Sequence, residues 1–156
     1  MKYVIDASVA LRWYIEEERH EYADAVLRRL IHEPQAFAVP ELFGYETFST
    51  LFRVHPKPLE TFEEGIVPLL HSGLLRYPLT DGIARRAARF VGLGLTGYDA
   101  MYVALAEELG AVWLTFDGRA HSLIQQEHLS ADLGAGLPSD WAISSSGFTG
   151  CAARGS

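Results

Sequence analysis

The amino-acid sequence predicts an α/β fold with a mostly parallel central sheet of four to five strands. Short apolar runs rich in strand-forming residues alternate with longer segments whose apolar residues recur at helix spacing. Strands that are apolar on both faces must be covered on both faces, and helical crossovers provide that cover. With 156 residues, of which 49% are hydrophobic, the chain can form one domain around a buried core.

The first part of the chain is predicted to contain two strands and three helices. These are a strand at 3–6, helices at 7–17 and 20–33, a strand at 36–40 and a helix at 41–54. The run YVID is apolar until its last residue, as a buried strand is. Pro34 stops the second helix, and the third ends before Pro56.

The second part continues the alternation and ends in a weakly apolar tail. The predicted elements are a loop and short helix at 55–71, a strand at 74–79, helices at 81–94 and 97–110, a strand at 111–116, a short helix at 118–127 and a weak fifth strand near 128–133. Thr80 or Asp81 caps the helix that follows it. We expect one domain over residues 1–143 and a flexible tail over 144–156, which holds few large apolar residues.

Composition narrows the classes of protein. The single cysteine excludes an intramolecular disulfide and a cysteine-rich zinc site, and it suits the reducing cytoplasm. No apolar run approaches the ~20 residues of a membrane span, and Asp6 interrupts the pattern of a signal peptide. The net charge of -7 argues against a general basic surface for nucleic acid. An anionic substrate would therefore need metal ions or clustered arginines.

Acidic residues interrupt segments that are otherwise apolar. They are Asp6, Glu46, Asp99 and Asp117. The aspartates lie after strands or at a helix start, where α/β folds place their sites. Clustered carboxylates need protons or cations, and Mg2+ or Mn2+ prefers such oxygen ligands. Each acid also has an ordinary interpretation, as a helix cap, a turn residue or a solvated side chain.

Three blocks of sequence carry a resemblance to the PIN-domain family, and more narrowly to the VapC-type toxin ribonucleases. The blocks are YVIDASVALRWY, VPELFGYETFSTLF and LTGYDAMYVALAEELGAVWLTFDGR, within residues 2–133. The first and last are specific, and the middle block amounts to a proline followed by a helix with one glutamate. The resemblance implies a PIN-like three-layer α/β/α sandwich.

The resemblance also implies an activity and partners. It implies Mg2+ or Mn2+ at Asp6, Glu46, Asp99 and Asp117, with Ser8 and Thr115 supporting these carboxylates. It further implies endonucleolytic cleavage of RNA by metal-activated water, with transfer RNA or ribosomal RNA as possible targets. A homodimer and a cognate antitoxin that blocks the site are implied as well.

Arginines near the acids are candidates for contacts with RNA. Arg12 and Arg119 stand close to the first and last acids and are the better candidates for RNA contacts, with Arg53 as a further one. A solvated helix face better explains Arg85, Arg86 and Arg89.

Two alternative functions were compared with the sequence. A phosphatase with an aspartyl nucleophile usually carries a second aspartate two positions after the first, and this chain has Ser8 there. A non-catalytic PIN-like domain that binds RNA or protein stays open.

Overall fold

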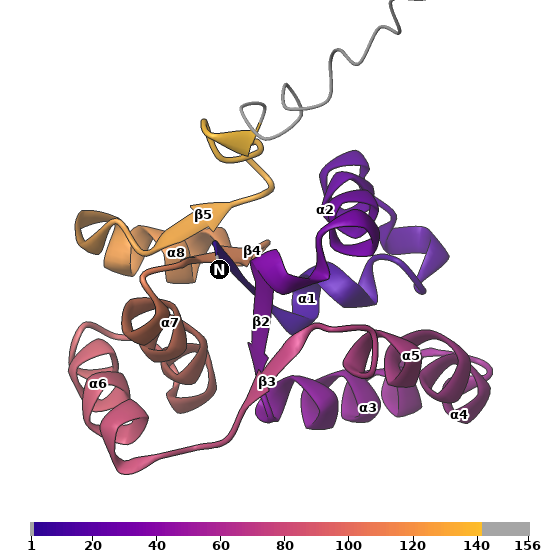
Figure 1. Ribbon diagram of the computed structural model, residues 1–156, viewed down its shortest axis with the longest axis horizontal. Coiled ribbons are helices and arrows are strands. Elements are labelled where there is room, and N and C mark those ends of the chain that lie inside the picture. Colours follow the sequence, from indigo (N-terminus) through magenta and orange to yellow (C-terminus); the bar gives the residue numbers. More distant parts are fainter. Residues whose placement is uncertain (1, 142–156) are drawn as a thin grey trace, which may run out of the picture.

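A parallel five-stranded sheet forms the centre of the protein, whose computed structural model describes residues 2–141 (Figure 1). The strands are β1 (Tyr3–Ile5), β2 (Phe37–Pro40), β3 (Leu75–Tyr77), β4 (Val112–Thr115) and β5 (Ser130–Asp132). Their spatial order is β3-β2-β1-β4-β5, and every pairing among them is parallel. Val4 of β1 pairs with Ala38 on one side and Trp113 on the other. The predicted parallel sheet is confirmed, and the weak fifth strand is present.

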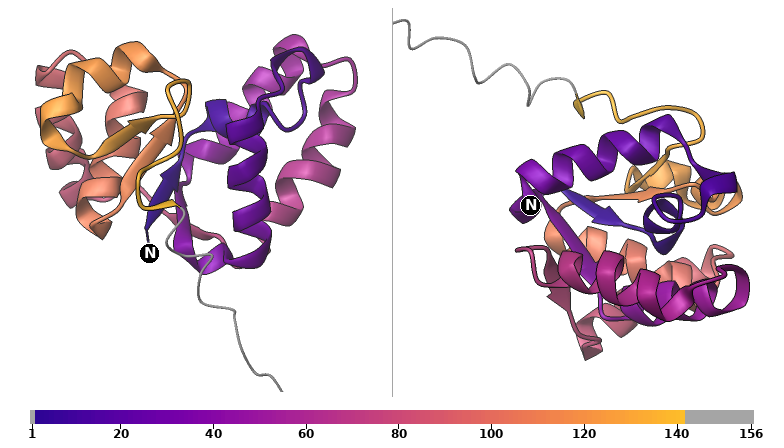
Figure 2. Two further views of the ribbon diagram at one scale, coloured as in Figure 1. Left: turned by 90° about the horizontal axis from the view of Figure 1, so that it is seen from above. Right: turned by 90° about the vertical axis from the view of Figure 1, so that its right-hand side faces the viewer.

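Helices cover both faces of this sheet and complete the predicted α/β/α sandwich. They are α1 (Ala7–Leu11), α2 (Glu21–His32), α3 (Leu42–Val54), α4 (Pro58–Thr61), α5 (Val67–Leu70), α6 (Asp81–Gly92), α7 (Gly97–Leu109) and α8 (Gly118–Ile124). Figure 2, left, shows α1 to α5 on one side of the strands and α6 to α8 on the other. Helix α7 packs against β1, β2 and β4, so it lies over the middle of the sheet.

Local chemistry explains where several elements begin and end. Thr96 caps α7 by accepting a hydrogen bond from the N–H of Asp99 at 3.2 Å. Gly110 ends the same helix in the left-handed region, at φ 62°. Thr80, rather than Asp81, caps α6 by accepting from Ile83 N–H. The four residues of β2 are fully buried, which is why that strand reads as an unbroken apolar run.

The helix predicted at 7–17 is shorter in the structure. Helix α1 ends at Leu11, and a separate 3-10 turn forms at Glu16–Glu18. The Trp13 indole N–H donates to Ala23 C=O at 2.7 Å, and the Tyr14 hydroxyl donates to Gly65 C=O at 2.8 Å. These tertiary contacts draw the chain away from the helix axis, and local helix propensity is too weak to resist them.

The segment predicted as a loop and short helix is more helical than expected. It forms α4, a π-helical turn at Phe62–Ile66 and α5. The predicted boundary at residues 143 and 144, and the tail that follows it, lie outside the described residues. Within residues 2–141, no helix combines the length and apolar character needed to cross a bilayer.

Candidate acidic site

The four acidic residues predicted from the sequence come from both helix layers and the carboxyl edge of the sheet. Asp6 follows β1, and Asp117 follows the neighbouring strand β4. Glu46 lies on α3, and Asp99 lies in the first turn of α7. Because parallel strands all end at one edge, residues distant in sequence meet there.

Asp6 is the most buried of these acids, with 8% of its surface exposed. Its Oδ2 accepts hydrogen bonds from Ser8 N–H at 3.1 Å and from the Thr115 hydroxyl at 3.4 Å. Ser8 Oγ in turn accepts from Phe116 N–H at 3.2 Å, and Thr115 Oγ1 accepts from Asp117 N–H at 3.0 Å. The two hydroxyls therefore join the ends of β1 and β4 and fix the Asp6 carboxylate between them.

Two of the ordinary interpretations also hold in the structure. Asp6 caps α1 through the Ser8 N–H, and Asp117 caps α8 by accepting from Ala120 N–H at 2.9 Å. A capping carboxylate keeps its second oxygen available for another partner. Capping and membership of an acidic site are therefore compatible at both positions.

The carboxylates are coupled to one another through a poorly solvated space. Burial raises the pKa of Asp6 to about 7; hydrogen bonds from Ser8 oppose this rise, and the charges of Glu46 and Asp99 add to it. Burial also raises the pKa of Glu46, where the Tyr102 hydroxyl opposes the rise and Asp99 adds to it. The pKa of Asp99 is raised by burial and then by Asp117, against a hydrogen bond from Thr96. The site thus favours either protons or a cation.

The residues fit a hard divalent cation. Carboxylate and hydroxyl oxygens are the donors that Mg2+ and Mn2+ prefer, and Mg2+ commonly needs only one or two carboxylates because it keeps several waters. The buried Oε1 of Glu46 has no hydrogen-bond partner of normal geometry among the described residues. As they stand in residues 2–141, no three histidine, cysteine or acidic side chains are close enough together to hold one ion. An ion at this edge would therefore draw on carboxylates of the four acids and complete its shell with water.

Two cavities open beside the acids. One of about 430 Å³ is lined by Glu46, Ser49, Thr50 and Arg53, with aromatic side chains at its rim. A smaller one of about 50 Å³ brings Asp99, Asp117 and Arg119 together. Each cavity is thus lined by both an arginine and a carboxylate.

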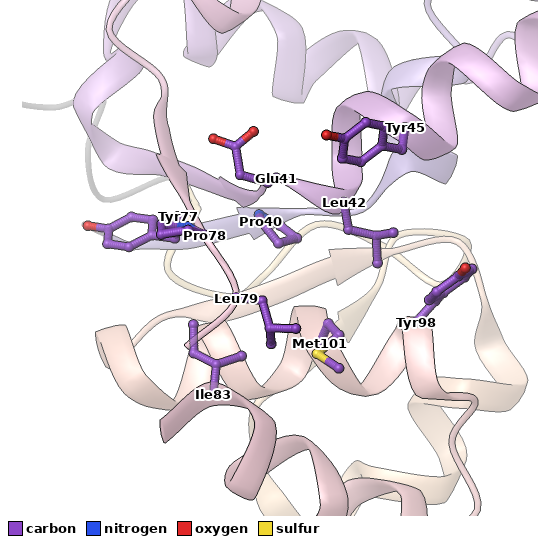
Figure 3. Close-up of a pocket in the computed structure, with 10 residues that line it drawn as sticks. All are labelled: Pro40, Glu41, Leu42, Tyr45, Tyr77, Pro78, Leu79, Ile83, Tyr98 and Met101. Carbon is purple, nitrogen blue, oxygen red and sulfur yellow. The ribbon is translucent and has the colours of Figure 1, made fainter. Parts of the chain in front are cut away.

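A third cavity, of about 250 Å³, is lined mainly by apolar groups and adjoins the first (Figure 3). Leu42 and Tyr45 of α3 face Leu79, Tyr98 and Met101 across it. Three of these side chains are largely exposed: Tyr45 at 73%, Leu79 at 65% and Tyr98 at 64%. We name this surface the α3–α7 apolar face.

Three further arginines of the sequence analysis, Arg12, Arg86 and Arg89, make contacts within the protein. The Arg12 guanidinium lies 4.0 Å from the centroid of the Phe116 ring, and its Nη1 donates to Glu18 C=O at 3.1 Å. Of the three arginines of α6, Arg86 and Arg89 are ion-paired, and Arg85 is exposed to solvent. Arg86 and Arg89 both pair with Glu107, and Arg89 also pairs with Glu127. This network joins α6 to α7 and the turn after α8.

The sequence does not single out Tyr102, and the structure places it beside the acids. Tyr102 is fully buried on α7, and burial followed by the charges of Asp6 and Glu46 raises its pKa well above the usual value. The available signal was its spacing. Tyr102 stands three residues after Asp99, on the same side of a helix that is apolar almost all round.

The comparisons with known proteins agree with this architecture. The model of the PIN domain matches residues 3–124. The chain is 31% identical over 122 residues to Ribonuclease VapC3 of Pyrobaculum aerophilum, covering 75% of this chain and 90% of that protein.

Solved structures show the same fold. The crystal structure of PAE2754 from Pyrobaculum aerophilum is 25% identical, with a TM-score of 0.58 over 79% of this chain and 84% of that one. A toxin-antitoxin complex from Klebsiella pneumoniae is 15% identical, with a TM-score of 0.60 over 78% of this chain and 91% of that one. The VapC20 toxin of Mycobacterium tuberculosis, which cleaves the sarcin-ricin loop, is 11% identical, with a TM-score of 0.57 over 95% of this chain and 97% of that one. The family model matches most of this chain, and the acids of the chain lie at the carboxyl edge of the sheet. The chain therefore belongs to the PIN-domain family.

Proposed function

We propose that this chain is a metal-dependent endoribonuclease and the toxin component of a toxin–antitoxin pair. The observation that carries the proposal is the set of electrostatically coupled carboxylates at the carboxyl edge of a PIN-domain sheet. Asp6, Glu46, Asp99 and Asp117 are the residues we assign to the metal site. The name of the relative that is 31% identical, Ribonuclease VapC3, supports the same activity.

The geometry supports roles for several of these residues in phosphodiester hydrolysis. A bound Mg2+ or Mn2+ would supply activated water and stabilise the leaving oxygen. Asp6 is fixed in place by Ser8 and Thr115, so its carboxylate needs little reorganisation when a metal ion binds. Arg119 shares a small cavity with Asp99 and Asp117, which suits an RNA phosphate beside the acids.

Two further arginines are assigned weaker roles in holding RNA. Arg53 shares the larger cavity with Glu46. Arg12 is partly committed to Glu18 and Phe116, so we assign it a contact at the margin of the site. With a net charge of -7, these local cations would offset the repulsion between the chain and RNA.

A cleavage assay tests the activity directly. Total RNA, with its transfer and ribosomal species, is incubated with wild type or Asp6→Asn in the presence of Mn2+ or EDTA. We expect discrete fragments only with wild type and Mn2+. Activity that survives in Asp6→Asn would contradict the assignment. RNA binding without cleavage in both proteins would favour the alternative, a non-catalytic PIN-like domain that binds RNA or protein.

Partners and location complete the proposal. We propose a cytoplasmic protein that is held inactive by a cognate antitoxin and that forms a homodimer. The α3–α7 apolar face is the surface we assign to the second copy, because it carries both a cavity and protruding side chains such as Leu79. A face with both features can be complementary to itself across a two-fold axis.

A further inference from the structure

Tyr102 is a buried polar group that the proposed catalytic residues do not explain. Its side chain is fully buried in the interior between α7 and the sheet. A phenylalanine would fill that space without burying a hydroxyl, and a buried hydroxyl is costly unless it has a partner. The presence of the hydroxyl therefore calls for a polar neighbour, and the neighbours are acidic.

The contacts of the hydroxyl identify that neighbour. The Tyr102 hydroxyl lowers the pKa of Glu46, and the Ala7 N–H lowers the pKa of Tyr102, as nearby donors do. These approaches do not reach normal hydrogen-bond geometry, and both the hydroxyl and Glu46 Oε1 are fully buried. The hydroxyl and the carboxylate oxygen are thus complementary buried groups, and neither makes a hydrogen bond elsewhere among the described residues.

The tyrosine is itself held rigidly. Its ring stacks on that of Trp113, with centroids 6.1 Å apart and planes 23° from parallel. Trp113 belongs to β4, the strand next to the central strand β1, so the tyrosine ring is anchored to the sheet. Tyr102 also lies one helical turn after Asp99 on α7. A rotation of this helix would therefore move the hydroxyl and the Asp99 carboxylate together.

We propose that Tyr102 is a positioning residue that holds Oε1 of Glu46 and thereby turns its other carboxylate oxygen toward the metal site. The proposal rests on the proposed function, since it assigns Glu46 to that site. Glu46 lines the larger cavity while its Oε1 is buried, so Oε2 is the oxygen on the cavity side. The hydroxyl thus sets the orientation of the one acid that sits on a long side chain in the middle of a helix.

The test compares Tyr102→Phe with Tyr3→Phe, a matched control. Tyr3 is equally buried, and its hydroxyl donates to Asp140 at 3.0 Å; it precedes Val4 in β1, at the end of the strand opposite Asp6. Binding of Mn2+ is followed by the rise in melting temperature across a titration. We expect Tyr102→Phe to raise the half-saturating Mn2+ concentration roughly ten-fold, as loss of a partner of a metal ligand does. Tyr3→Phe should stay within about two-fold of wild type. Equal half-saturation for Tyr102→Phe and wild type, or an equal rise in Tyr3→Phe, would overturn the role.

A second measurement needs no metal and separates this inference from the proposed function. Urea unfolding in EDTA is measured for Tyr102→Phe, Glu46→Gln and the double variant. The effects on unfolding should be non-additive, because each substitution removes one side of the same contact. Additive effects would overturn the contact. A wild-type protein with no response to Mn2+ would overturn the proposed metal site, and the contact would then be decided by this cycle alone.

Discussion

Asp6 makes the stability of the metal-free protein depend on pH in a direction opposite to that of a carboxylate in a salt bridge. Burial raises the pKa of Asp6 from 3.8 to about 7 in the folded state. Below about pH 4 the carboxyl is protonated in both states, and its burial has no electrostatic cost. As pH rises, the unfolded chain releases the proton first, and folding then requires either proton uptake or a buried charge. Stability present at low pH is therefore lost up to about pH 7.

The size of this loss in stability follows from the shift in the pKa of Asp6. A difference of about three pKa units, at ~1.4 kcal/mol each, lowers the free energy of unfolding by about 4 kcal/mol. Asp6→Asn carries no charge at this position. Its free energy of unfolding relative to wild type should therefore grow by about 4 kcal/mol from pH 4 to pH 8. A constant offset from the new amide does not affect that slope, and Glu46 and Asp99 are present in both proteins.

Urea unfolding in EDTA at several pH values between 5 and 8 measures the difference. Between pH 5 and 7 the advantage of Asp6→Asn should grow by ~1.4 kcal/mol per pH unit and then level off. A difference that changes by less than about 1 kcal/mol over the whole range would refute the reasoning. It would mean that water reaches the carboxylate, or that its hydrogen bonds from Ser8 and Thr115 outweigh its burial.

Other perturbations test separate features. Mn2+ or Mg2+ should raise the melting temperature of wild type, because it binds only the folded state. Asp99→Asn should raise the metal-free melting temperature, by removing a partly buried charge near Asp117 and Glu46, and it should abolish the response to metal; a lower metal-free value would count against a strained cluster. Gly65→Ala would place a methyl group 2.5 Å from the Tyr14 ring, so urea unfolding should show a loss of about 1–3 kcal/mol; an unchanged midpoint would mean that the ring shifts freely. Leu79→Asp puts a charge in the α3–α7 apolar face, and light scattering should report a monomer in place of a dimer; a surviving dimer would place the interface elsewhere.

Patterns of two kinds made much of the fold predictable from the sequence. Strands buried on both faces are unbroken apolar runs, so β1 and β4 were located with the acids that follow them. Caps and glycines marked the limits of α6 and α7. The end of α1 could not be found in this way. It is set by contacts of Trp13 and Tyr14 with distant backbone carbonyls, and these depend on the completed fold.

The position of a site residue could be predicted from the sequence only where that residue directly follows a strand. Asp6 follows a strand, so its place at the carboxyl edge follows from topology. Glu46 lies in a helix with apolar residues on more than one side, and Phe48 and Phe52 of that helix are partly exposed. The sequence alone could not tell which side of α3 faces the acids. Tyr102 was hidden for a related reason, since its helix is apolar almost all round and a polar tip does not show in the pattern.

The double use of Asp6 and Asp117 as helix caps has a genetic consequence. Asparagine accepts the same capping hydrogen bonds as aspartate, and the codons of the two residues differ by a single base. One point mutation at either position would therefore yield a chain that folds, keeps the rest of its surface, and lacks a carboxylate of the site. Under the proposed function, such a mutation is a short path to an inactive chain that still occupies the cognate antitoxin.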